Sequence, residues 1–346
     1  MEHVRNSFAK LFSIELLSSP LSSPSVDITF PQLSYSESHN ISLPVTDEEI
    51  KHALWSLKAF KSPGPDRLHT GFFQWFWLVV GSSVSEEIKK IFSDRKIPSD
   101  LNQTHIALIP KIKGPESIGN FRPISLCNSV YKIITKIIVA RIRPLLDKLI
   151  SPYQAAFVPG RKGVDNVIIM QELIHTISRK KGNIGYMVIK IDLEKVYDRL
   201  EWSFIKEVLV AANFPPNLIQ LIMSCVSTVS TSILFNGGVL DPFLPSRGIR
   251  QRDPLSPYLF ILCMEVLGRI IDDKCTNNLW NSDKASTGGP AFSHIFFVDD
   301  LLLFAKANSL NCESVKDVVE EFCMISGQKI NTAKSKVFFS PNVSSE

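Results

Sequence analysis

Some segments of this chain place their apolar residues at helical spacing, and others contain short apolar runs typical of strands. Residues 50–57 place their apolar side chains at helical spacing, and Thr46 with the acidic residues after it has the pattern of a helix N-cap. Further helices or apolar helical segments are expected at about 72–92, 129–149, 201–212 and 254–271.

Shorter runs predict strands. Residues 104–110 and 120–126 have extended character, and 186–191 is a nearly continuous apolar run, as expected for a strand covered on both faces. The sequence around Asn236-Gly237-Gly238 predicts a hairpin, and residues 295–304 predict a second hairpin with two aspartates at its tip. Strands separated by helices, with hairpins among them, favour an α+β sheet layered on helices.

Two segments are predicted to be irregular. Residues 13–45 are rich in serine and proline and have little periodicity, which favours a linker or an extended arm. KSPGPD at residues 61–66 holds two prolines and a glycine, so we expect a loop there.

Composition narrows the class of protein. The 346 residues exceed the length of one typical domain, about 100–200 residues, so two subdomains are expected. The 45% hydrophobic and 21% charged residues indicate a globular chain rather than a disordered one. The net charge of +4 is too small to indicate by itself a nucleic-acid-binding protein.

The six cysteines have neither zinc-ligand nor disulfide-framework spacing, so we expect reduced thiols. No apolar run reaches the roughly 18 residues of a membrane span, and no signal peptide is recognisable. The expected location is therefore intracellular, in the nucleus or the cytoplasm.

The candidate chemistry lies in aspartates at the ends of apolar strands. Asp192 ends the run 186–191, and Asp299 with Asp300 separates two apolar stretches. Adjacent carboxylates repel each other, and a hard cation such as Mg²⁺ would neutralise them. On these residues alone the alternative stays open that the pair is ordinary solvated turn chemistry.

Several segments, in order from about residue 48 to residue 340, resemble the reverse transcriptases of plant-type LINE (non-LTR) retrotransposons. They are KSPGPD at 61, LIPKIKGPESIGNFRPISL at 108, YQAAFVPGR at 153, IKIDLEKVYDRLEW at 189, GIRQRDPLSPYLF at 248, FFVDDLLLFA at 296 and SGQKINTAKSKVFF at 326. The resemblance implies a right-hand polymerase of α+β class, with fingers and an antiparallel palm sheet on helices. The expected division is an N-terminal arm or linker (1–45), fingers with part of the palm (46–180) and palm with motifs A to D (181–346). The thumb is expected to be missing.

The same resemblance implies an RNA-directed DNA polymerase that transfers a nucleotide from a dNTP to a primer 3′-hydroxyl. Asp192 matches the catalytic aspartate of motif A, and Asp299 and Asp300 match motif C. Asp192 and Asp299 would hold two Mg²⁺ ions, for which Mn²⁺ could substitute, with Asp300 in support. The implied partners are an RNA template, a DNA primer, dNTPs, and endonuclease and thumb or C-terminal regions of a full-length element, with no membrane.

Further residues are assigned by their match to the family. Lys111 and Arg122 match basic fingers residues that hold the triphosphate, and Tyr197 matches the aromatic residue that favours deoxynucleotides. Gln251 matches the motif B glutamine beside nucleotide and template. Lys334 corresponds to the motif D lysine that helps protonate pyrophosphate, with Lys336 close enough to be the alternative.

Four positions depart from the usual family pattern. Arg67 and Arg252 replace glycines, and Val196 and Val298 replace alanines. A glycine in a loop often marks a positive φ or a close backbone approach, so Arg252 is expected to impair the site. Val298 is expected to be a mild change.

These departures keep another hypothesis open, namely a catalytically dead remnant that at most binds nucleic acid. All four exchanges can arise by single C→T or G→A changes, as expected of a decaying element. A third hypothesis, a maturase-like RNA-binding module, is disfavoured by the YDRLEW and FVPGR segments.

Overall fold

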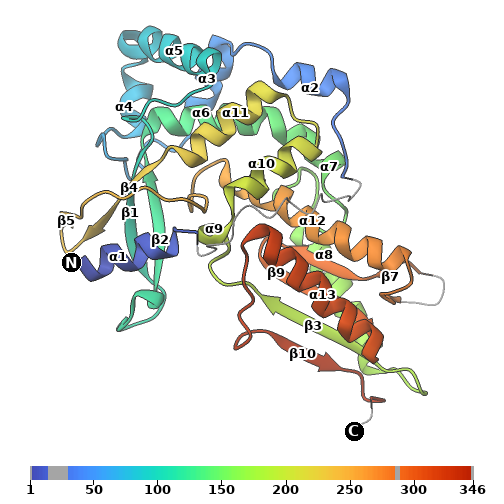
Figure 1. The fold of residues 1–346 in the computed structure, drawn as a ribbon. Helices are drawn as coiled ribbons and strands as arrows, with labels where there is room; N and C mark the ends of the chain where they lie inside the picture. The colour runs from blue at the N-terminus through green and yellow to red at the C-terminus, as the bar shows by residue number, and fades with distance from the viewer. Residues whose placement is uncertain (1, 15–29, 285–288, 344–346) are drawn as a thin grey trace. The chain divides into compact units, whose positions relative to one another are not determined.

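The computed structural model describes residues 2–14, 30–284 and 289–343 (Figure 1). It forms two compact units, and each is assembled from separate stretches of chain. Unit 1 takes its described residues from 1–17, 33–145 and 197–258, and unit 2 takes them from 18–32, 146–196 and 259–346. Within the described residues, no helix is both long enough and apolar enough to cross a membrane.

Unit 1 contains a four-stranded sheet in the order β2-β1-β4-β5. Strand β1 (Gln103–Pro110) is antiparallel to β2 (Phe121–Cys127) and parallel to β4 (Ser230–Phe235), which pairs with β5 (Gly238–Val239). The helical elements of this unit are α1 (Glu2–Leu11), α2 (Tyr35–Ile41), α3 (Asp47–Trp55), α4 (Thr70–Trp75), α5 (Trp77–Asp94), η1 (Ile118–Asn120), α6 (Ser129–Ile142), η2 (Arg143–Leu145), α10 (Trp202–Ala211) and α11 (Pro216–Ser227).

Local chemistry explains where several of these elements begin and end. Thr46 and Glu49 form a reciprocal capping box at the start of α3, with N···O distances of 3.2 and 3.0 Å, so the predicted N-cap is confirmed. The helix predicted over 129–149 is confirmed but is interrupted at η2, where Pro144 supplies no backbone N–H. The loop predicted at 61–66 is also confirmed.

The prediction of an arm or linker over 1–45 is wrong for helices α1 and α2, and its residues 15–29 lie outside the described part of the chain. Phe8 of α1, together with Phe12, is buried against Ile106, Ile233 and Phe243. The Arg247 guanidinium donates to the carbonyl of Leu11 at 3.1 and 3.0 Å, at the end of the helix where the dipole favours a cation.

Unit 2 is built on the antiparallel sheet β10-β3-β9-β8. Its strands are β3 (Tyr186–Asp192), β8 (His294–Phe297), β9 (Asp300–Lys306) and β10 (Lys336–Phe339), beside the small pair β6 (Asp283–Lys284) and β7 (Ala291–Phe292). Its helices are α7 (Leu146–Leu149), α8 (Gly163–Ser178) and α13 (Ser309–Ser326). Helices α9 (Val196–Arg199) and α12 (Ser256–Thr276) contribute residues to both units.

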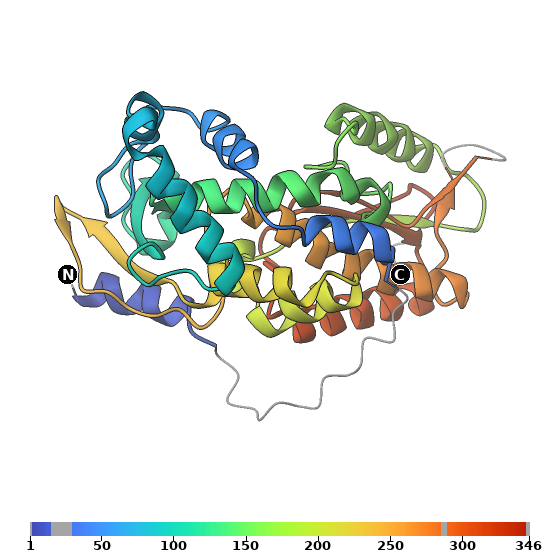
Figure 2. The same ribbon diagram turned by 90° about the horizontal axis from the view of Figure 1, so that it is seen from above.

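Helices cover both faces of this sheet, with α8 on one face and α13 on the other (Figures 1 and 2). Leu173 and Ile177 of α8 pack in one cluster with Val188, Ile295 and Phe304 of the strands. The prediction that the strand over 186–191 is covered on both faces is therefore confirmed.

Buried His294 in β8 makes the stability of the fold depend on pH. Burial, with a smaller contribution from Arg269, lowers the pKa of His294 from 6.5 to about 3. The unfolded state therefore binds more protons below pH 6.5, and stability is lost as the pH falls from there toward 3. We expect His294→Phe to reduce the loss of unfolding free energy between pH 6.5 and 4 by ~1–3 kcal/mol in urea denaturation.

The matched control is His175→Phe on the exposed side of α8, which is expected to leave the pH profile unchanged. Identical profiles for His294→Phe and the parent chain would contradict this assignment.

Candidate active site

The predicted catalytic carboxylates lie together at one end of the sheet in unit 2. Asp192 ends β3 and lies directly opposite Asp300, the first residue of β9. Opposed residues of an antiparallel pair point to the same face, with Cβ atoms about 4.5–5.5 Å apart. Phe297 of β8 and Asp300 of β9 form the pair that closes the hairpin. The turn between them therefore consists of Val298 and Asp299. The predicted hairpin with carboxylates at its tip is confirmed.

The carboxylates at this end of the sheet repel one another. Burial raises the pKa of Asp299, and the charges of Asp300 and Asp192 raise it further, whereas Lys190 lowers it. Lys190 Nζ lies 3.2 Å from Asp300 Oδ1. A bound cation would relieve the remaining repulsion, and these oxygen donors fit a hard divalent ion.

Among the described residues, no three histidine, cysteine, aspartate or glutamate side chains lie close enough together to form a complete metal site. The observation that supports a cation here is the repulsion between neighbouring carboxylates, and the donor chemistry agrees with it. The donor chemistry of these residues therefore fits the divalent metal that the family resemblance implies.

The turn that carries Asp299 is strained at its first residue. Val298 has φ 56°, in the left-handed region, where a β-branched side chain is a genuine outlier. Two-residue hairpin turns with positive φ at the first position alone (type II′) have glycine there. Val298 was expected to be a mild change on the basis of side-chain size, and that view left out the backbone cost, which is on the order of 1–3 kcal/mol.

The chain after α13 supports the end of β3. Asn331 donates its backbone N–H to the Asp192 carbonyl at 2.8 Å, and the Asp192 N–H donates to Ser335 Oγ at 3.1 Å. Lys334 lies exposed within this loop, and Lys336 lies in β10 opposite Lys190. Both candidate lysines thus belong to the segment that borders β3.

Two basic residues of unit 1 lie at the same end of the β1–β2 ribbon. Arg122 of β2 lies opposite Ile109, and Lys111 follows directly after β1. Lys111 Nζ donates to the Gly119 carbonyl at 3.1 Å. Both side chains are exposed to solvent, as residues that hold a triphosphate must be.

The segment with Gln251 is tied to α9. Gln251 Nε2 donates to Asp198 Oδ1 at 3.0 Å, and the Ile249 N–H donates to the Tyr197 carbonyl at 2.7 Å. Gly248 has φ +88°, and a Cβ there would lie 2.7 Å from the Asp198 carbonyl oxygen. Sequence reasoning did not single out Asp198, although it lies next to Tyr197 in motif A and fixes the amide of Gln251.

The two arginines that replace family glycines have a left-handed backbone conformation. Arg252 has φ 75° and Arg67 has φ 59°, so the backbone at both positions has the conformation that glycine adopts most easily. The Arg252 side chain is exposed, whereas Val196 is 6% exposed at the start of α9.

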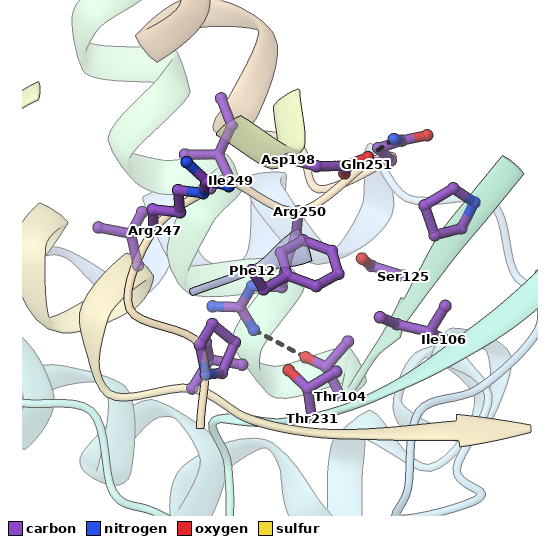
Figure 3. A pocket seen from close by; sticks show the side chains of 15 residues that line it. Phe12, Thr104, Ile106, Ser125, Asp198, Thr231, Arg247, Ile249, Arg250 and Gln251 are labelled. Carbon is purple, nitrogen blue, oxygen red and sulfur yellow. Dashed lines mark hydrogen bonds between the residues drawn. The ribbon is translucent and has the colours of Figure 1, made fainter. Parts of the chain in front are cut away.

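Arg250, next to Gln251, is a buried residue that sequence reasoning missed. Its guanidinium donates to Thr104 Oγ1 at 3.0 Å (Figure 3). It also donates to Asn102 Oδ1 at 2.8 Å and lies 3.9 Å from the Tyr131 ring centroid. It borders a narrow pocket in unit 1 with room for about one water molecule. Only its position beside the glutamine of motif B could have indicated it.

The predicted site residues thus fall into two groups. Unit 2 brings together the carboxylates and the lysine of the last loop, and unit 1 contains the two basic ribbon residues, the aromatic residue of α9 and the glutamine. The members are Asp192, Asp299, Asp300 and Lys334 in unit 2, and Lys111, Arg122, Tyr197 and Gln251 in unit 1.

Comparison with known proteins adds an independent observation. The profile of the family "Reverse transcriptase (RNA-dependent DNA polymerase)" matches residues 109–344. The chain is similar to the transposon TX1 149 kDa protein of Xenopus laevis, with 27% identity over 334 residues, which cover 96% of this chain and 25% of that protein. It is also similar to the Pol polyprotein of the type-2 retrotransposable element R2DM of Drosophila melanogaster, with 28% identity over 291 residues, 84% of this chain and 26% of that protein.

A shorter match joins the chain to an uncharacterized mitochondrial protein of Arabidopsis thaliana, with 42% identity over 67 residues, 19% of this chain and 55% of that protein. The chain spans about a quarter of the length of the two retroelement proteins. A family profile that covers most of the chain, relatives from retrotransposons and carboxylates paired across an antiparallel sheet agree with one another. The chain belongs to the reverse transcriptase family, as the reverse transcriptase domain of a non-LTR retrotransposon.

Proposed function

We propose that this chain catalyses RNA-directed DNA synthesis by adding a deoxynucleotide to a primer 3′-hydroxyl, with release of pyrophosphate. The observation that carries the proposal is the pairing of Asp192 with Asp300 across β3 and β9, with Asp299 in the adjoining turn. The charges of Asp300 and Asp192 help to raise the pKa of Asp299, and such a carboxylate is costly to keep charged unless a cation binds it.

Asp192 and Asp299 would hold two divalent ions, Mg²⁺ or in its place Mn²⁺, with Asp300 in support. When bound, such ions favour deprotonation of the attacking hydroxyl and stabilise charge on the leaving oxygen. Lys190 neutralises part of the charge of Asp300, which makes Asp300 the weaker ligand of the set.

The other residues act by holding the nucleotide. Lys111 and Arg122 would bind the triphosphate through charge-assisted hydrogen bonds. Tyr197 would contact the sugar and disfavour a 2′-hydroxyl. Gln251, held by Asp198, would lie beside nucleotide and template, and Lys334 would give a proton to the leaving pyrophosphate.

The proposal extends to the arrangement of the chain and its partners. Residues 46–180 would form the fingers with part of the palm, and 181–346 the palm. The partners would be an RNA template and a DNA primer, together with endonuclease and C-terminal regions of a full-length element.

The test is primer extension on poly(rA)/oligo(dT) with Mg²⁺ and dTTP. It compares the parent chain, Arg252→Gly, and Arg252→Gly combined with Asp299→Ala. Since Arg252 occupies a left-handed position, we expect Arg252→Gly to extend at least about tenfold faster than the parent. The added Asp299→Ala is expected to abolish extension.

Asp317→Ala, an exposed carboxylate of α13, is the matched control in the same background. Extension that survives Asp299→Ala would contradict the proposed site. If neither the parent nor Arg252→Gly extends the primer, although both still bind primer–template, the hypothesis of a nucleic-acid-binding remnant would be favoured.

A further inference from the structure

The YQAAFVPGR segment has no role in the proposed function, although it is among the segments that define the family resemblance. In unit 2 it forms a tightly held loop before α8. Arg161 closes this loop, donating to the Gln154 carbonyl at 2.8 Å and to the Ile150 carbonyl at 2.7 Å. A guanidinium that binds several backbone carbonyls fixes the loop more firmly than chain connectivity alone.

This loop is attached to strand β8. The Phe296 N–H donates to the Tyr153 carbonyl at 2.8 Å. In α8, which follows the loop, Asn166 Nδ2 donates to the Phe296 carbonyl at 3.0 Å. A parallel bridge pairs Gln154 with Phe296. The loop therefore serves as an additional partner along the edge of the strand that leads to the catalytic turn.

The Gln154 side chain reaches the turn itself. It is 2% exposed, and its Oε1 accepts the N–H of Ala156 at 3.0 Å and the N–H of Val298 at 3.3 Å. Within the described residues, its Nε2 has no hydrogen-bond partner. The acceptor oxygen, rather than the amide donor, is thus the part of this side chain that the structure uses.

Gln154 accepts a hydrogen bond from Val298, the residue with the strained backbone conformation. Val298 has φ 56° and immediately precedes Asp299. The cost of such a conformation is comparable to the contribution of one hydrogen bond. Loss of the Gln154 acceptor would therefore allow the turn to relax and move Asp299 and Asp300 relative to Asp192.

We propose that Gln154 is a positioning residue of the catalytic turn, and that its Oε1 holds the Val298 amide so that Asp299 and Asp300 stay in register with Asp192. The inference rests on the proposed function, in which these carboxylates bind divalent ions. Gln154 itself touches neither substrate nor metal in this assignment.

The test measures Mn²⁺ affinity by electron paramagnetic resonance and primer extension with dTTP, both in the Arg252→Gly background. Gln154→Leu removes the acceptor oxygen. Gln154→Asn keeps a buried amide, but its side chain is shorter by one methylene, so its oxygen lies farther from the Val298 N–H. Both variants are expected to weaken Mn²⁺ binding and to lower kcat by roughly tenfold, the factor that corresponds to one hydrogen bond, with KM for dTTP unchanged. Gln171→Leu on the exposed side of α8 is the control.

Rescue separates positioning from a general loss of structure. Val298→Gly makes the left-handed turn unstrained, so the double variant Gln154→Leu/Val298→Gly is expected to recover most of the lost Mn²⁺ affinity. A double variant as weak as Gln154→Leu would overturn the inference, as would unchanged Mn²⁺ affinity in both Gln154 variants. Mn²⁺ binding that follows the expected pattern without any extension would count against the proposed function and support the positioning role. Absence of Mn²⁺ binding by the starting variant would overturn both.

Discussion

Asp192→Asn is expected to lower primer extension by roughly a thousandfold in the Arg252→Gly background, whereas Asp300→Asn is expected to lower it by only ten- to a hundredfold. The difference follows from the charges around the two side chains. Asp300 already has Lys190 at 3.2 Å, so removing its charge leaves the site closer to balance. Asp192 has no such ion pair among the described residues, so under the proposed function its charge is expected to act directly on the bound cation.

The measurement is single-turnover dTTP incorporation, with primer–template affinity followed separately by fluorescence anisotropy. Affinity is expected to stay within about twofold, because phosphate contacts dominate nucleic-acid binding. Equal losses for Asp192→Asn and Asp300→Asn would show that Lys190 does not distinguish the two carboxylates.

Arg250→Met is expected to destabilise the fold by about 3–5 kcal/mol, the cost of breaking a buried ion pair by removing one partner. The side chain is 8% exposed, and its loss leaves Asn102 Oδ1 and Asp253 without their cationic neighbour. Burial acts to lower the pKa of the Arg250 guanidinium, but the surrounding Tyr131 and Cys127, with others, raise it on balance. The charge is therefore held by its partners, and methionine replaces only the apolar stem.

Urea denaturation followed by circular dichroism measures this effect. Arg122→Met on the exposed surface of β2 is the control and is expected to change the unfolding free energy by less than about 0.5 kcal/mol. A loss below about 1 kcal/mol in Arg250→Met would mean that the buried polar network is not a source of stability.

The elements with strong local signals could be predicted from the sequence. The capping box at Thr46, the extended runs of β1 and β3 and the carboxylate hairpin all depend on spacing or turn chemistry within a few residues. Helix α1 could not be predicted in this way, because its stability comes from Phe8 packed against Ile106, Ile233 and Phe243, which are distant in sequence. Tertiary packing rather than helix propensity decides such a case.

For the candidate site, residue identity could be predicted but the supporting contacts could not. The aspartates follow from strand ends and family resemblance. Gln154 and Arg250 act through hydrogen bonds to backbone and side chains distant in sequence, and spacing carries no signal for these. The positive φ of Val298 likewise depends on the turn that the two paired strands impose.

The interleaved composition of unit 1 bears on how the chain folds as it leaves the ribosome. Strand β1 needs β4 as its parallel neighbour, with Gln103 paired to Ser230, so its sheet stays incomplete until more than a hundred further residues are made. Non-local parallel pairing of this kind slows folding and exposes strand edges in the meantime. We therefore expect fragments that stop before residue 230 to aggregate. We also expect chaperones to be needed during translation to protect the unpaired edge of β1.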